Sequence, residues 1–180
     1  MRAMMSFLLG CILIGTILIG FVAAENFFVI DRILESPNPA EFHQKLAPLA
    51  EDDARIVLRF LSSELNRLYF RAWGGGEILL SGVLLILAMR SGPNGSKDRK
   101  LTIGAGVLLA MSLFMTFYLA TQLVEVGRAI DFVPRDPVPP EVRQFGMLHG
   151  AYSVLDLGKL AVGIWMTVLL ARSPASTPRA

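Results

Sequence analysis

Four long stretches of apolar residues constrain the fold of this chain more than any other feature. They cover residues 3–24, 73–90, 101–124 and 147–171. Each is close to the ~20 residues that an α-helix needs to cross the hydrocarbon of a bilayer. The chain is 53% hydrophobic and 18% charged, whereas a soluble domain has about 25% charged residues. The sequence therefore predicts an all-α membrane protein, with four transmembrane helices in a single domain covering residues 1–180.

Charge and motif content exclude several classes of function. The net charge of +2 is small, and no basic run interleaved with aromatic residues indicates a nucleic-acid partner. Cys11 is the single cysteine, so no disulfide or thiolate metal cluster forms within one chain. Ser81 and Ser153 have no companion motif of a hydrolase. We expect a protein that is not an enzyme and has no cofactor, surrounded by the lipid bilayer.

The positions of lysine and arginine predict the topology. The loop between the second and third stretches carries four basic residues and one acidic residue, namely Arg90, Lys97, Arg99, Lys100 and Asp98. Short loops rich in Lys and Arg stay in the cytoplasm. This loop and both termini are therefore predicted to be cytoplasmic, in a bacterial inner membrane. Four crossings return the chain to the side on which it began.

The first stretch has a second interpretation. Arg2, an apolar run and the small residues 22–24 before Glu25 are typical of a secretory signal with its cleavage site. The run is about 20 residues long, whereas the apolar core of a signal has about 7–15. We favour a helix that is retained, and cleavage stays the alternative.

The long connection of residues 25–72 is expected to be an extracytoplasmic helical loop. Its first residues could continue the first helix, and the prolines of Ser36–Pro39 would end it. Asn38 is a candidate N-cap for a short helix through Phe42, His43 and Leu46. Apolar residues at helical spacing from Ile56 to Leu68 then predict an amphipathic helix that lies on the membrane or on the bundle.

That amphipathic helix is expected to lead into the second crossing, where Gly74–Gly76 permit a kink or a close contact with another helix.

The last apolar stretch carries polar side chains on one face. His149, Tyr152, Asp156 and Lys159 fall within an arc of roughly 80° on a helix. Ionisable groups at membrane depth cost about 3 kcal/mol each, so they normally face a partner, a cavity or a pathway. This stripe is more than a membrane anchor requires.

Depth along the helices predicts which polar groups meet. Counting about 1.5 Å per residue from the cytoplasmic ends places Glu77 and Lys159 both roughly 20 Å into the membrane. We therefore predict an ion pair between them. On the third stretch, one arc of about 80° contains Met111, Met115, Tyr118, Gln122 and Glu125. The polar groups of these helices all fall in the outer half of the membrane.

Two interpretations of this convergence stay open. Polar residues can simply hold membrane helices together, at around 0.6–2 kcal/mol per contact. Alternatively they line an outward-facing pocket that binds or conducts a small cation, a proton or a metal-related solute. The candidate residues are Glu77, Tyr118, Gln122, Glu125, His149, Tyr152, Asp156 and Lys159. Glu77, Asp156 and Lys159 sum to one negative charge, which favours a site, and a proton would balance it at the least cost.

A structural or assembly subunit that packs against a partner's helices is the alternative function, with a second copy or another membrane protein as the candidate partner. A metal site is weakly supported. His43, Met147 and His149 are its candidate ligands, because imidazole and thioether suit copper. Methionines scattered along helices more often pack than bind a metal.

Three segments together resemble a known family. They are Phe145-x-x-x-His149-Gly150-x-Tyr152-Ser153, followed by leucines at 155, 157 and 160; Leu65–Arg71 before the second crossing; and Arg128-x-x-Asp131-Phe132-Val133-Pro134-Arg135. The chain is similar in these segments to the small four-helix membrane proteins of unknown function that include eukaryotic transmembrane protein 205-like proteins. The resemblance implies a multi-pass membrane protein, with a link to metal or platinum-drug tolerance in eukaryotic members.

Overall fold

The structure is a computed structural model, and it describes residues 1–36, 40–91, 96–133 and 137–172. Its elements are α1 (Arg2–Glu35), α2 (Ala40–Leu46), α3 (Glu51–Arg90), α4 (Ser96–Phe114), the π-helical turn η1 (Met115–Leu119), α5 (Ala120–Ala129) and α6 (Pro140–Ala171). Four helical stretches are long and apolar enough to cross a membrane. The prediction of an all-α fold with four such helices is confirmed in the described residues.

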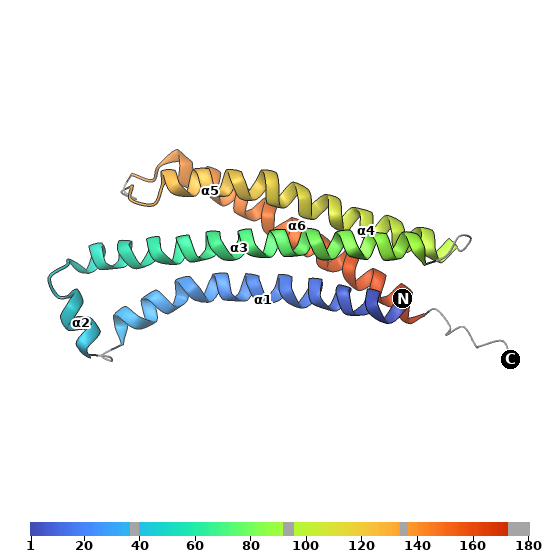
Figure 1. The fold of residues 1–180 in the computed structure, drawn as a ribbon. Coiled ribbons are helices and arrows are strands. Elements are labelled where there is room, and N and C mark those ends of the chain that lie inside the picture. The colour runs from blue at the N-terminus through green and yellow to red at the C-terminus, as the bar shows by residue number, and fades with distance from the viewer. Residues whose placement is uncertain (37–39, 92–95, 134–136, 173–180) are drawn as a thin grey trace.

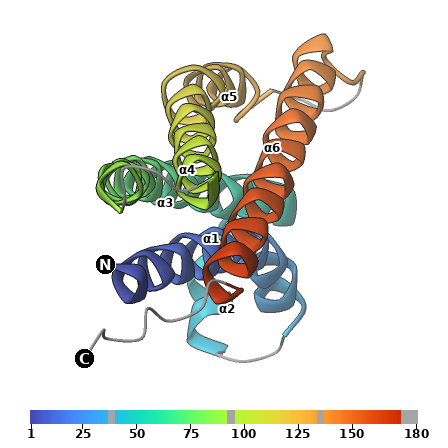
Figure 2. The ribbon, with the colours of Figure 1, turned by 90° about the vertical axis from the view of Figure 1, so that its right-hand side faces the viewer.

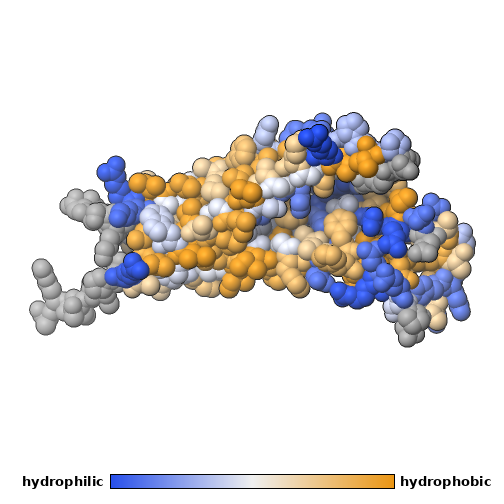
Figure 3. Space-filling view, turned by 180° about the vertical axis from the view of Figure 1, so that it is seen from behind, coloured by the Kyte–Doolittle hydropathy of each residue, from blue (hydrophilic) through white to orange (hydrophobic). Residues whose placement is uncertain are grey.

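The long helices form a four-membered bundle (Figures 1 and 2). α1 and α4 each pack against both α3 and α6, so α3 and α6 occupy opposite corners. Figure 1 shows the N-terminus and the last turns of α6 at one end of the bundle, called here the terminal end. α2 and the chain after α5 lie at the other end, called the loop end. On the face shown in Figure 3, an apolar band covers the middle of the molecule, and hydrophilic side chains cover two lobes of the loop end with a recess between them.

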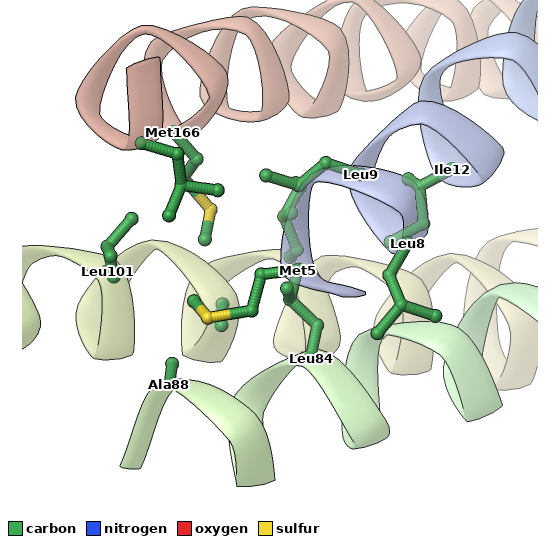
Figure 4. Packing of buried hydrophobic residues seen from close by; sticks show 11 residues of the cluster. Met5, Leu8, Leu9, Ile12, Leu84, Ala88, Leu101 and Met166 are labelled. Carbon is green, nitrogen blue, oxygen red and sulfur yellow. The ribbon is translucent and has the colours of Figure 1, made fainter. Parts of the chain in front are cut away.

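The apolar core lies toward the terminal end. Met5, Leu9, Leu84, Leu108 and Met166 have no exposed surface and come from all four long helices (Figure 4). Side chains packed this closely make many favourable van der Waals contacts. This core therefore stabilises the bundle through the fit of its side chains.

Glycines let the helices approach one another in this core. A Cβ atom on Gly104 of α4 would lie 2.7 Å from the Met166 sulfur, and one on Gly163 of α6 would lie 2.7 Å from Cδ2 of Leu13. At Gly74 a Cβ would lie 2.6 Å from the Thr116 hydroxyl. The close helix contact expected within Gly74–Gly76 is thus present at its first residue, in a helix that continues through the triplet.

The loop between the first two crossings differs from the prediction in one respect. α1 does continue to Glu35 and a short helix does follow, although the candidate N-cap Asn38 lies outside the described residues. The expected amphipathic helix is not a separate element, because α3 is one helix of 40 residues. No proline interrupts residues 51–90, so nothing in the chain ends the helix before the predicted second crossing. The part of α3 nearer the loop end packs against α1, where Arg55 forms an ion pair with Asp31.

Candidate functional site: a buried charge cluster

Lys159 of α6 lies between two carboxylates in the middle of the bundle. Its Nζ donates hydrogen bonds to both oxygens of Glu77 on α3, at 2.8 and 2.7 Å. It also lies 2.9 Å from Oδ1 of Asp156, one turn earlier on α6. Glu77, Asp156 and Lys159 are called here the charge cluster. The predicted ion pair between Glu77 and Lys159 is confirmed, and it joins the two helices at opposite corners of the bundle.

Burial makes this arrangement costly unless every charge is balanced. Glu77 and Lys159 are each only 2% exposed, whereas the side chain of Asp156 is 25% exposed. Taking an ion out of water costs several kcal/mol, which the attraction to a partner repays only in good geometry. Lys159 supplies such a partner to Glu77, but its single positive charge faces two carboxylates. With both carboxylates ionised, the charge cluster carries one surplus negative charge, and Asp156 is its partly exposed carboxylate.

Three more polar side chains surround the charge cluster. Ser112 of α4 lies near Glu77, and its hydroxyl donates to the Leu108 carbonyl at 2.9 Å. Ser81, one turn after Glu77 on α3, is fully buried, and its hydroxyl has no hydrogen-bond partner among the described residues. Toward the loop end, the half-buried Tyr152 packs edge-on against Phe70, with ring centroids 5.5 Å apart.

The structure does not bring the eight predicted pocket residues together. Tyr118 is 56% exposed and stacks on Phe114. Glu125 is exposed and accepts a hydrogen bond from Gln122 at 3.5 Å. His149 is also exposed. The bundle brings together the charge cluster and Tyr152, whereas for the exposed side chains the single pocket stays a prediction.

The reason lies in the rotation of each helix. The buried side chains of the third crossing include Leu101, Leu108, Ser112 and Leu119, and Tyr118, Gln122 and Glu125 are centred about 80° away from them. His149 is rotated by about the same angle from the buried position of Lys159 on α6. A narrow polar arc shows which residues share a face, but not that this face points inward.

The predicted metal ligands also lie apart. His43 on α2 places its Nε2 2.5 Å from the Ser36 carbonyl oxygen, and His149 stacks on Phe145. α2 lies beside the end of α1, whereas the first turns of α6 lie beside α5 (Figures 1 and 2). Within the described ranges, no group of three or more His, Cys, Asp or Glu residues could hold a metal ion. The set of His43, Met147 and His149 is not a site in this structure.

A second polar cluster, which the sequence analysis missed, closes the loop end. Arg67 of α3 donates from Nη2 to both oxygens of Asp131, at 3.0 and 2.8 Å, and from Nη1 to Glu64 at 2.5 Å. Arg128 lies 3.6 Å from Glu64. The side chains of Arg67 and Asp131 are only 11% and 9% exposed. This Arg67 cluster ties α3 to the end of α5.

The sequence shows the residues of this cluster but does not predict that they pair. Arg67 and Asp131 lie in two of the segments that resemble the membrane family, but 64 residues separate them. Nothing in the sequence tells which of many loop charges will meet. Comparison with protein-family models, with curated proteins and with solved structures finds no match for this chain.

Proposed function

We propose that this chain is an integral membrane protein whose four long helices cross a bacterial inner membrane, with both termini in the cytoplasm. The apolar band is the part of the surface that lipid would cover. The terminal end carries exposed basic residues, among them Arg90, Arg99 and Arg172, in keeping with the distribution of Lys and Arg in cytoplasmic loops. The loop end then faces away from the cytoplasm. Membership of the family that the sequence resembles is part of this proposal.

We further propose that the charge cluster binds a proton or a small monovalent cation. The observation that carries this proposal is the contact of one ammonium group, Lys159, with two carboxylates at 2.7–2.9 Å. A surplus charge in a low-dielectric site is costly, and an added cation removes it. Asp156 is the reachable carboxylate, because its side chain is 25% exposed. The unpartnered Ser81 hydroxyl beyond Glu77 offers a further oxygen ligand.

The packing favours binding over conduction by one copy. Toward the loop end, Tyr152 and Asp156 are only half-buried, so this is the side from which an ion would approach. Toward the terminal end, the fully buried Met5, Leu9 and Leu108 fill the centre of the bundle. Apolar side chains packed in this way offer no groups to replace the hydration shell of an ion. The proposed function is therefore a cation-responsive membrane protein that is loaded from the loop side.

Thermal unfolding of the purified protein in detergent tests this function. We expect the midpoint of the unmodified chain to rise when the pH is lowered or when Na⁺ or Li⁺ is added at constant ionic strength, because a ligand that binds only the folded state stabilises it. Asp156→Asn removes the surplus charge, so its midpoint should be higher at neutral pH and should no longer respond.

Glu125→Gln is the matched control, since it neutralises an exposed carboxylate outside the charge cluster. It should respond to pH and cations as the unmodified chain does. If Asp156→Asn keeps the full response, the charge cluster does not bind the cation, and its role is only to hold α3 and α6 together. Separate titrations with acid and with NaCl distinguish a proton site from a metal-cation site.

A role in assembly is the second candidate function, and one observation favours it. An apolar face of α3 stays exposed along its length, including the part beyond the apolar band.

A further inference from the structure

The exposed face of α3 follows a seven-residue repeat. Apolar or small residues occupy the first and fourth positions of each heptad from Leu58 to Met89. These ten residues, called here the α3 seam, are Leu58, Leu61, Leu65, Leu68, Ala72, Gly75, Leu79, Gly82, Ile86 and Met89. Seven of them are exposed, three are half-buried and none is buried. An unbroken repeat of more than four heptads is typical of a helix that pairs with another in a left-handed coiled coil.

The rest of the bundle leaves this seam uncovered. The buried residues of α3 in the crossing are Gly74, Glu77, Ser81, Leu84 and Ala88, and they are centred on the opposite side of the helix from the seam. α1 and α4 flank α3, and α6 lies across the bundle from it (Figure 2). One whole side of α3 therefore faces outward.

Lipid does not account for the outer part of the seam. Leu61 and Leu68 are 55% and 59% exposed. Both lie beyond the exposed Arg71 on the loop side, and Leu61 lies about 15 Å further along the helix. The neighbouring contacts at this level are polar, such as the hydrogen bond from Asn26 to Asn66 at 2.6 Å and the pairing of Arg67 with Asp131. A row of leucines among such groups would contact water unless a protein covers it.

We propose that a second copy of this chain covers the α3 seam, so that two α3 helices pair in parallel as a coiled coil that begins in the membrane and extends beyond its loop-side surface. Copies inserted in the same direction stand at the same depth, so each seam residue meets its counterpart around a twofold axis. No seam residue is charged, so this self-pairing brings no like charges together. The proposal needs the four-helix membrane insertion but not the charge cluster.

The middle of the seam permits a close approach. A Cβ atom on Gly75 or on Gly82 would meet nothing within 4 Å, so these two glycines leave open space on the outer face. Small residues at such positions let two membrane helices come into backbone contact. A seam about 46 Å long on a helix about 10–12 Å wide offers on the order of 500 Å² per copy, near the lower bound for a specific interface.

Disulfide cross-linking in membranes tests the pairing. In a Cys11→Ser background, Leu61→Cys and Leu68→Cys should each give a covalent dimer on mild oxidation, because a fourth-position residue faces its counterpart. Arg59→Cys is the matched control, being exposed on the same stretch but pointing away from the seam. Dimers at 61 and 68 but not at 59 support the proposal. Equal cross-linking at all three positions, or none at any, overturns it, and a cross-linked product of another mass identifies a different partner.

The mass of glycine variants in detergent is a second test of the pairing. Gly75→Leu and Gly82→Leu should shift the protein in detergent from dimer to monomer mass without lowering its unfolding midpoint in the monomeric state, because neither side chain enters the bundle. Gly20→Leu is the control, since Gly20 of α1 is exposed, has the same open space and lies outside the seam. A protein that is monomeric before any substitution, in native membranes as well as in detergent, overturns the proposal. The cation response of the charge cluster should persist in the monomer, so the two proposals fail separately.

Discussion

The two halves of the bundle are held together by different interactions. Toward the terminal end, apolar side chains from the four long helices pack together, with Met5, Leu84 and Met166 fully buried. From the charge cluster to the loop end, charged and amide side chains join the helices. Lys159 joins α6 to α3, Arg67 joins α3 to the end of α5, and Asn66 donates to the Ala23 carbonyl of α1 at 3.0 Å.

Because of this difference, the stability of the two halves should depend differently on pH and salt. Packing between apolar side chains depends on shape and changes little with pH or salt. The stability of the terminal half should therefore change little with either. Paired charges depend on the ionisation of each partner and on the dielectric around them. The loop half is therefore the part whose stability a proton or cation can change. It is also where the function proposed above places its site.

The largest expected loss of stability comes from removing the ammonium group of Lys159, the one positive charge of the charge cluster. Lys159→Met leaves Glu77 and Asp156 without their shared partner, and breaking a buried pair in this way costs about 3–5 kcal/mol. Unfolding in mixed micelles should show this loss. Adding Glu77→Gln and then Asp156→Asn should recover it stepwise. Lys100→Met, which changes an exposed lysine, should have little effect. Strictly additive losses would mean that these charges do not interact and that the two halves do not differ as described.

The next effect concerns the Arg67 cluster. Arg67→Met removes a two-pronged contact with Asp131 that is about nine-tenths buried, and hydrogen bonds to charged groups contribute about 1.5–3 kcal/mol. Hydrogen exchange should then speed up in α5 and in the outer turns of α3 while the terminal half stays protected. The comparison is Arg32→Met, whose ion pair with Glu25 is 67% and 40% exposed and should contribute about 0–1 kcal/mol. Uniformly faster exchange across the whole bundle would contradict a division into two halves.

The smallest expected loss of stability is in the apolar terminal half. Gly104→Ala places a methyl group 2.7 Å from the Met166 sulfur, whereas Gly106→Ala, two residues later on α4, meets nothing within 4 Å. Overpacking costs about 1–3 kcal/mol, and we expect about 1 kcal/mol at Gly104 because a methionine side chain can move aside. The loss at Gly104 should be the same at pH 5 and at pH 8, unlike the changes at the charge cluster. A pH-dependent loss there would show that the terminal half is not independent of ionisation.

The sequence alone determined the positions of groups along the helix axes. Four apolar stretches of near-membrane length predicted the four long helices. The rise per residue placed Glu77 and Lys159 at one depth, where they form the predicted contact at 2.7–2.8 Å. Length along a helix is a property of the backbone and does not depend on neighbours. Depth could therefore be counted before any helix was placed beside another.

Only the tertiary structure decided how each helix is rotated and which distant segments meet. Rotation turned Tyr118 and His149 outward, although their polar arcs were correctly recognised. The pairing of Arg67 with Asp131 across 64 residues also depends on packing. A helix turns the face that fits its neighbours toward them, and that fit involves side chains from several helices at once. The sequence of one helix shows which residues share a face, whereas the assembled bundle decides what that face contacts.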